Sequence, residues 1–154
     1  MVALTEEAHA ALTQMLSERV IERTYAALVE GNVQNSVGAV DAPIARSATD
    51  YRKMVISAGG KPSATNFVCL SEFENATLLE CKLESGRTHQ IRVHMSSIGH
   101  PVYGDKKYGS KHDIGDRFFL HAKALLFNHP VTDELLTFEA SLPADLEAVI
   151  EKLD

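Results

Sequence analysis

The residues best suited to chemistry gather in one short stretch, from Ser85 to Asp105. These twenty-one residues include two arginines, three histidines, one aspartate and three glycines. Arginine binds anions, histidine and aspartate can move protons, and glycine lets the backbone turn sharply or approach a ligand closely. No other part of the chain is as dense in such groups. The stretch is therefore the first candidate for a functional site.

A strand is expected to lead into this stretch. Residues 76–84 alternate between apolar and polar side chains, which is typical of a half-buried strand. Ser85 and Gly86 then predict a turn, and a helix is expected to begin near Thr88. The helical spacing predicts a core-facing stripe of Ile91, Met95 and Ile98, and a second face of His89, Arg92 and Ser96.

Arg87 would then lie in the turn just before the helix. The first backbone N–H groups of a helix lack partners within the helix, and they attract negative charge. A guanidinium fork beside them can hold a carboxylate or a phosphate through two parallel hydrogen bonds. The sequence therefore predicts an anion site at Arg87.

Length and composition predict a single globular domain. The chain has 154 residues, of which 45% are hydrophobic, and this is enough for a real core. No apolar run reaches the roughly 18 residues that a membrane-spanning helix needs. Cys69 and Cys81 are expected to be reduced core residues, which fits a cytoplasmic protein.

The charge pattern restricts any nucleic-acid contact to a local surface. The formal net charge is −6, whereas a general nucleic-acid binder is usually basic. Residues 82–107 nevertheless carry five lysines and arginines against two acids. RNA binding would therefore depend on this basic region rather than on the overall field of the protein.

The remaining segments predict an α+β fold with a mixed, largely antiparallel sheet and about three helices. Residues 1–4 are expected to be the tail of a buried strand, and Thr5 is expected to cap a helix with an apolar stripe. Six or seven strands follow, mostly in hairpin order, and the hairpins include residues 120–127 with 135–140. A last helix is expected to begin near Pro143.

The histidines raise the alternative of a metal site. His89, His94 and His100, with Asp105 as a fourth ligand, could bind zinc in a metal-dependent hydrolase. Their spacings of five and six residues do not place the histidines on one helix face. We therefore expect no metal and no cofactor, and we expect Asp105 to pin the following loop to the helix through a salt bridge.

Several motifs together resemble the RluA-type pseudouridine synthases, which isomerise uridine in ribosomal and transfer RNA. Residues 85–95 resemble the arginine motif of that family, and residues 99–109 resemble the segment that follows it. Residues 120–122 and 127–130 fit as well, and residues 23–31 resemble the tyrosine motif. The motifs occur in the order of the family and cover nearly the whole chain.

The resemblance implies roles for individual residues. Arg87 corresponds to the arginine that pairs with the catalytic aspartate and orients it. Tyr25 corresponds to the tyrosine that stacks on the target base and is proposed to take a proton from it. Arg23 stands where the family often has a basic residue. The expected contacts to RNA come from Arg23, Arg46, Arg52, His89, Arg92, Lys106 and Lys107.

The nucleophilic aspartate of the family is absent from these 154 residues. It belongs to a segment that reads Arg-Leu-Asp, and none of the aspartates here follows Arg-Leu. We therefore expect residues 1–154 to be the C-terminal portion of a catalytic domain, inactive alone, with an exposed strand edge that favours dimerisation or swapping. The substrate is expected to be RNA, with ribosomal RNA favoured over transfer RNA. The alternative is a non-catalytic RNA-binding module.

Overall fold

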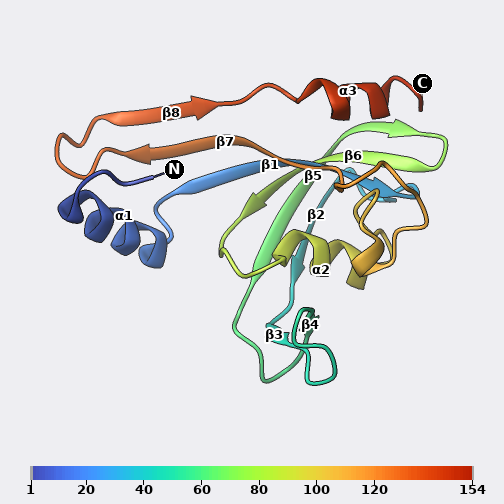
Figure 1. Cartoon of the computed structure of the whole chain (residues 1–154), viewed down its shortest axis with the longest axis horizontal. Coiled ribbons are helices and arrows are strands. Elements are labelled where there is room, and N and C mark those ends of the chain that lie inside the picture. The colour runs from blue at the N-terminus through green and yellow to red at the C-terminus, as the bar shows by residue number, and fades with distance from the viewer. Residues whose placement is uncertain (1, 154) are drawn as a thin grey trace.

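The computed structural model describes residues 2–153 and is built around one antiparallel sheet (Figure 1). Its six strands lie in the order β2-β5-β6-β1-β7-β8, and β3 and β4 form a separate small sheet. The strands are β1 (Glu22–Glu30), β2 (Val37–Asp41), β3 (Ile44–Arg46), β4 (Met54–Ile56), β5 (Ala64–Phe73), β6 (Ala76–Leu83), β7 (Leu120–Asn128) and β8 (Leu135–Glu139). The helices are α1 (Glu6–Glu18), α2 (Gln90–Ser97) and α3 (Ala144–Ile150), with a 3₁₀ turn, η1 (Lys106–Tyr108). The predicted α+β class and largely antiparallel sheet are confirmed.

Both faces of the central strands are covered, so successive apolar residues of β1 are buried on opposite faces of the sheet. Ala27 and Val29 point to a core under α2 that includes Ile91 and Met95. Leu28 points to the other face, where it packs in a second core with residues of α3. Figure 1 shows α2 and α3 on opposite sides of the sheet. Alternating side chains of one strand therefore serve two separate cores.

The turn between β6 and α2 is longer than the sequence predicts. The helix begins at Gln90 rather than near Thr88, because His89 adopts a left-handed conformation with φ of 56°. The Gln90 side chain closes the turn by accepting hydrogen bonds from Ser85 Oγ and from the Arg87 backbone N–H. The helix ends at Ser97, so Ile98 lies beyond it and is exposed, and the prediction that Ile98 faces the core was wrong.

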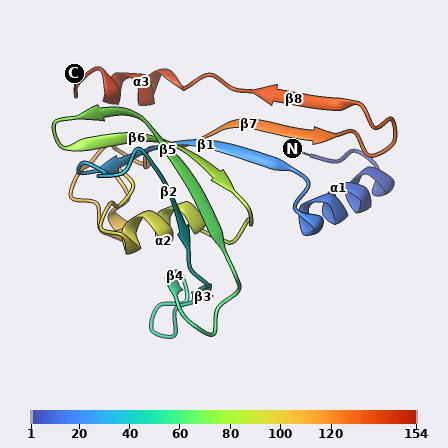
Figure 2. The ribbon, with the colours of Figure 1, turned by 180° about the vertical axis from the view of Figure 1, so that it is seen from behind.

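The N-terminal segment departs most from expectation. Thr5 caps α1 as predicted, and its hydroxyl accepts from the Ala8 N–H. Residues 2–4 form no strand, and Val2 and Leu4 are 84% and 93% exposed. The part of the predicted strand at Met1 lies outside the described residues. No residue of α1 is buried, because the helix lies at the end of β1 and β7, away from α2 (Figure 2).

The state of the two cysteines and the absence of a membrane-spanning helix among residues 2–153 match the expectations from the sequence. Cys69 and Cys81 are both free thiols, and burial raises the pKa of Cys81 to about 12. Cys81 therefore behaves as a small apolar core residue. Within residues 2–153, no helix has both the length and the apolar character required to cross a membrane.

His94 locks α2 to the sheet from inside the core. The side chain is fully buried, with Nδ1 bonded to Thr65 Oγ1 at 2.9 Å and Nε2 bonded to the Ala42 carbonyl oxygen at 3.0 Å. Burial lowers the pKa of His94, although the Ala42 carbonyl and the nearby Asp41 carboxylate act in the opposite direction. The folded protein therefore favours the neutral imidazole.

We expect the free energy of unfolding to fall as the pH drops below about 6.5, because the unfolded chain then binds a proton that folded His94 resists. His89 contributes with the same sign, since burial also lowers its pKa. Urea denaturation at about pH 7.5 and about pH 5.5 measures the difference, and His94→Gln should reduce it. His9→Gln, on the exposed surface of α1, is the control. A wild-type stability that is equal or greater at the lower pH would contradict this account.

Candidate active site and RNA-facing surface

Two elements far apart in sequence share one hollow beside Arg87. The hollow has a volume of about 480 Å³, and its lining residues are Ile44, Ala45, Arg46, Met54, Gly59, Gly60, Lys61, Gly86, Arg87 and Thr88. The first seven belong to the β3–β4 hairpin and the segment after it, and the last three belong to the turn after β6. Three of the lining residues are basic and none is acidic. The hollow is therefore suited to an anion.

Arg87 has an unused donor at this hollow. Its backbone N–H is bonded to Gln90 Oε1 at 3.0 Å, which fixes the turn. Its Nε is buried and has no hydrogen-bond partner among residues 2–153. A buried donor without a partner costs about 1–3 kcal/mol. An incoming carboxylate or phosphate would remove this cost.

Arg23 lies against the same turn, and it too has a buried donor without a partner within residues 2–153. A Cβ atom at Gly86 would lie 2.2 Å from Arg23 Nη1, so any larger residue there would require this guanidinium to shift. The Nε of Arg23 is also buried without a partner in the described part of the chain. Neither Arg23 nor Arg87 takes part in a salt bridge within residues 2–153. Within the described residues, two arginines with unpaired Nε donors thus lie next to Gly86, Arg87 as its chain neighbour and Arg23 from β1.

Tyr25 lies on the same face of β1 as Arg23, because the two are two residues apart in one strand. Its Cα faces Cys81 in β6 and Ala122 in β7. The side chain is half-buried and packs against the core under α2. The strand register therefore places the Tyr25 phenol on the sheet face that α2 covers, and the turn that carries Arg87 leads into α2.

A buried ion pair joins α2 to the loop that follows it. Arg92 Nε and Nη2 bind the two carboxylate oxygens of Asp105 at 2.6 Å and 2.8 Å. The Arg92 guanidinium carbon also lies 4.1 Å from the ring centre of Phe118 and 4.8 Å from that of Tyr108. The predicted salt bridge of Asp105 is confirmed. The Arg92 side chain is only 10% exposed, so it has a structural role, and the expected contact of Arg92 to RNA stays a prediction.

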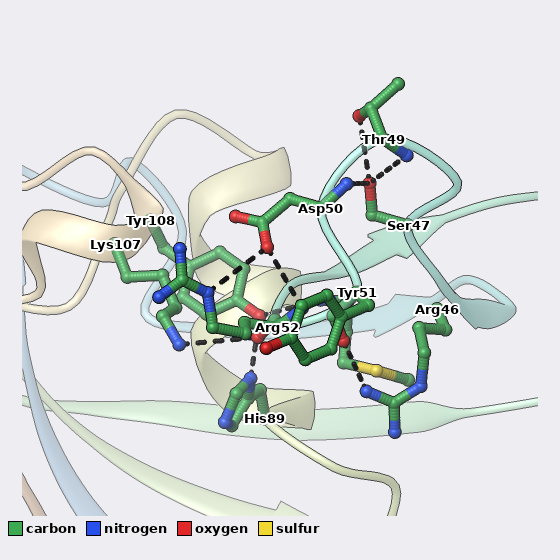
Figure 3. A network of polar contacts seen from close by, with 10 residues as sticks. Arg46, Ser47, Thr49, Asp50, Tyr51, Arg52, His89, Lys107 and Tyr108 are labelled. Carbon is green, nitrogen blue, oxygen red and sulfur yellow. Dashed lines mark hydrogen bonds and ion pairs between the residues drawn. The ribbon is translucent and has the colours of Figure 1, made fainter.

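Tyr108 is the residue that sequence reasoning missed, because it was noted only as part of a motif. Its hydroxyl is bonded to His89 Nδ1 at 2.8 Å and accepts from the Met54 backbone N–H at 2.9 Å (Figure 3). Its carbonyl oxygen accepts from Ser96 Oγ at 2.7 Å. The predicted face of His89, Arg92 and Ser96 is therefore real, and what it faces is Tyr108. One tyrosine ties α2 to the β3–β4 hairpin.

His89 is held neutral within this network. Burial lowers the pKa of His89 most, and the nearby Arg92 and Lys107 charges lower it further against the opposing effect of Asp105. Its Nδ1 is occupied by the Tyr108 hydroxyl. The expected contact of His89 to RNA stays a prediction.

The other predicted RNA contacts lie on the surface, and most of them gather at the hairpin. Arg46 donates to the Tyr51 carbonyl oxygen, and Lys107 Nζ donates to the Arg52 carbonyl oxygen at 3.3 Å (Figure 3). Lys106 instead pairs with Asp113 in the loop that follows, where both side chains are exposed. The fold thus brings Arg46, Arg52 and Lys107 together and leaves Lys106 to one side.

The histidines of the proposed metal site are directed to separate partners. His94 binds Thr65 and Ala42, and His100 Nδ1 binds the Glu30 carbonyl oxygen at 2.8 Å. Across residues 2–153, no group of three or more His, Cys, Asp or Glu side chains could hold a metal ion. Nothing in this geometry supports the metal-dependent hydrolase.

Comparison with known proteins identifies relatives of this chain. The family model described as RNA pseudouridylate synthase matches residues 1–97, a range that includes Tyr25 and Arg87. The uncharacterized RNA pseudouridine synthase YlyB of Bacillus subtilis is 45% identical over 154 residues, covering 99% of this chain and 51% of that protein. The ribosomal large subunit pseudouridine synthase D of Zymomonas mobilis is 40% identical over 163 residues, covering 99% and 51%.

A solved structure shows the same fold. Human RNA Pseudouridylate Synthase Domain Containing 1 superposes with a TM-score of 0.81 at 30% identity, covering 99% of this chain and 73% of that chain. The chain spans about half the length of the curated relatives described above.

Replacing Arg92 with methionine should destabilise the protein by about 3–5 kcal/mol, because the Asp105 carboxylate would stay buried without its partner. Adding Asp105→Leu to Arg92→Met should recover most of that loss. Arg117→Met is the matched control, since Arg117 pairs with Asp145 at 2.7 Å on the surface and should cost less than about 1 kcal/mol. Urea denaturation measures all three variants. Equal losses for Arg92→Met and Arg117→Met would show that the buried pair has no special weight.

Proposed function

Because the chain belongs to the RNA pseudouridylate synthase family, we propose that it carries Tyr25 and Arg87 of an active site that converts uridine to pseudouridine in RNA. The observation that supports this most is that two half-buried arginines, Arg23 and Arg87, each have a buried Nε atom without a partner within residues 2–153. A catalytic carboxylate and the RNA backbone both supply the acceptors that these donors need.

The role proposed for Arg87 follows from its geometry. A planar guanidinium binds a carboxylate through two hydrogen bonds and favours its ionised form. The ionised aspartate attacks the ribose C1′, and the base leaves with the electron pair of its bond from N1. The freed base turns, its C5 attacks C1′, and the bond from C1′ to the aspartate oxygen breaks, which restores the carboxylate. N1 takes up a proton from solvent. The proton that C5 then loses passes to a base, and we assign that step to Tyr25, which also stacks on the uracil ring.

The aspartate must come from a segment that these 154 residues do not contain in the family's form, since no aspartate follows Arg-Leu. We therefore propose that residues 1–154 form the C-terminal portion of the catalytic domain and do not turn over alone. The exposed apolar residues near α1 and β8, among them Leu16, Val20 and Leu135, would favour contact between two copies of the isolated chain.

The proposed substrate is large-subunit ribosomal RNA, and the proposed location of the protein is the cytoplasm. The name of the Zymomonas mobilis relative, ribosomal large subunit pseudouridine synthase D, supports this choice over transfer RNA. The residues proposed to bind RNA phosphates are Arg23, Arg46, Arg52, His89, Lys106 and Lys107. Of these six residues, Arg46 lines the basic hollow beside Arg87, which supports its assignment.

Tritium release from RNA labelled at uridine C5 tests the assignment. The 154 residues alone should give turnover on the order of 10⁴-fold below that of the same residues joined to a segment that supplies an Arg-Leu-Asp motif. Release by the 154 residues alone would show that another carboxylate serves as nucleophile. RNA binding without release by either protein would favour the non-catalytic RNA-binding module.

Two substitutions test the residue roles in the protein that turns over. Arg87→Lys should lower turnover by about 100-fold, because lysine cannot hold the carboxylate at two points. Tyr25→Phe should lower it by about 10²–10⁴-fold if the phenol transfers the proton. Arg117→Lys, in an exposed ion pair outside the site, is the control and should leave turnover unchanged. Full activity of Arg87→Lys would contradict the proposed role of the arginine fork.

A further inference from the structure

The loop between β3 and β4 presents an exposed aromatic ring on a well-fixed backbone. The Ser47 N–H bonds to the Lys53 carbonyl oxygen at 3.0 Å, and the Lys53 N–H bonds to the Asp50 carbonyl oxygen at 2.9 Å. Side chains tie the loop as well, since Asp50 N–H donates to Ser47 Oγ and Arg52 N–H donates to Asp50 Oδ1. Tyr51 lies at the tip of this bonded loop and is 73% exposed.

The surroundings of Tyr51 are basic in an otherwise acidic protein. Residues 44–61 contain Arg46, Arg52, Lys53 and Lys61 against the single acid Asp50. Arg46 donates to the Tyr51 carbonyl oxygen. The Arg52 guanidinium carbon lies 6.0 Å from the Tyr51 ring centre, at the outer limit of a cation–π contact. Arg52 Nε lies 3.6 Å from Asp50 Oδ1, but the Arg52 side chain is 71% exposed. The ring and the outer face of the guanidinium therefore remain accessible to a ligand.

Hydrogen bonds hold the loop close to the turn between β6 and α2, which carries Arg87. The Tyr108 hydroxyl accepts from the Met54 N–H and contacts His89, and Lys107 reaches the Arg52 carbonyl oxygen (Figure 3). The residues on either side of the tip, Arg46 and Met54, line the same hollow as Arg87. A basic surface therefore continues from Arg87 along the hairpin to Tyr51.

We propose that Tyr51 stacks on a base of single-stranded RNA that flanks the target uridine, while Arg46 and Arg52 bind the adjoining phosphates. A tyrosine at 73% exposure contributes little to the core, and an aromatic face next to arginines is what unpaired nucleotides need for stacking and charge neutralisation. The inference rests on the proposed function and adds to it a second contact, away from the reacting base.

A fluorescent reporter tests the stacking directly. The chain contains no tryptophan, so Tyr51→Trp introduces a single indole at the proposed site. Titration with oligouridylate should quench its fluorescence, because a base stacked on the indole is in direct contact with it. Inorganic polyphosphate of matched charge should cause little quenching. Equal quenching by both ligands, or none by oligouridylate, would overturn the proposal.

Affinity measurements separate the ring from the fold. Tyr51→Ala should weaken oligouridylate binding by about tenfold, the size usual for one base stack, while Tyr51→Phe should bind as wild type does. Phe138→Ala is the control, because Phe138 is also half exposed on a strand of the sheet, at 53%, but lies in β8 outside the hairpin (Figure 1). Equal affinity of Tyr51→Ala and wild type would overturn the inference.

The two proposals fail in different ways. A protein that releases tritium normally but binds oligouridylate equally with and without the Tyr51 ring would retain the proposed function and lose this contact. A protein that shows quenching at Tyr51→Trp but never releases tritium, even with an Arg-Leu-Asp segment supplied, would retain the contact and lose the reaction.

Discussion

The buried ion pair between Arg92 and Asp105 is the interaction on which the rest of the site depends. It joins α2 to the loop that follows, and its guanidinium lies close to the rings of Tyr108 and Phe118. Tyr108 is thereby fixed, and its hydroxyl then positions His89 at the start of α2 and Met54 in β4. The position of the β3–β4 hairpin relative to the turn that carries Arg87 thus depends on the buried Arg92–Asp105 pair.

Three arginines near the site show how differently one side chain can be used. Arg92 is satisfied by a carboxylate and belongs to the framework. Arg23 and Arg87 flank Gly86 with buried Nε donors that find no partner within residues 2–153. Native structures rarely keep such donors unless a ligand or a reacting group completes them. Arg92 is thus a framework residue, whereas Arg23 in β1 and Arg87 in the turn after β6 keep an Nε donor that an anion is proposed to complete.

The charge distribution explains how an acidic protein can offer a surface to RNA. The formal net charge is −6, but the hollow beside Arg87 is lined by three basic residues and no acids. A separate groove between α1 and the β7–β8 turn is lined by Glu18, Glu22 and Asp133 without any lysine or arginine. A polyanion such as the proposed RNA would be repelled at that groove and attracted to the hairpin.

Features that depend on chain neighbours could be determined from the sequence. Alternation predicted the strand of residues 76–84, Ser85 and Gly86 predicted the turn after it, and the order of the motifs predicted the family. The sequence also suggested the Asp105 salt bridge, but it did not identify Arg92 as the partner, and it gave Tyr51 no role. The stripe of α1 looked like a core face and is not buried. Only the tertiary structure decided these points, because burial and pairing depend on which distant segments meet, while periodicity depends only on residues nearby in the chain.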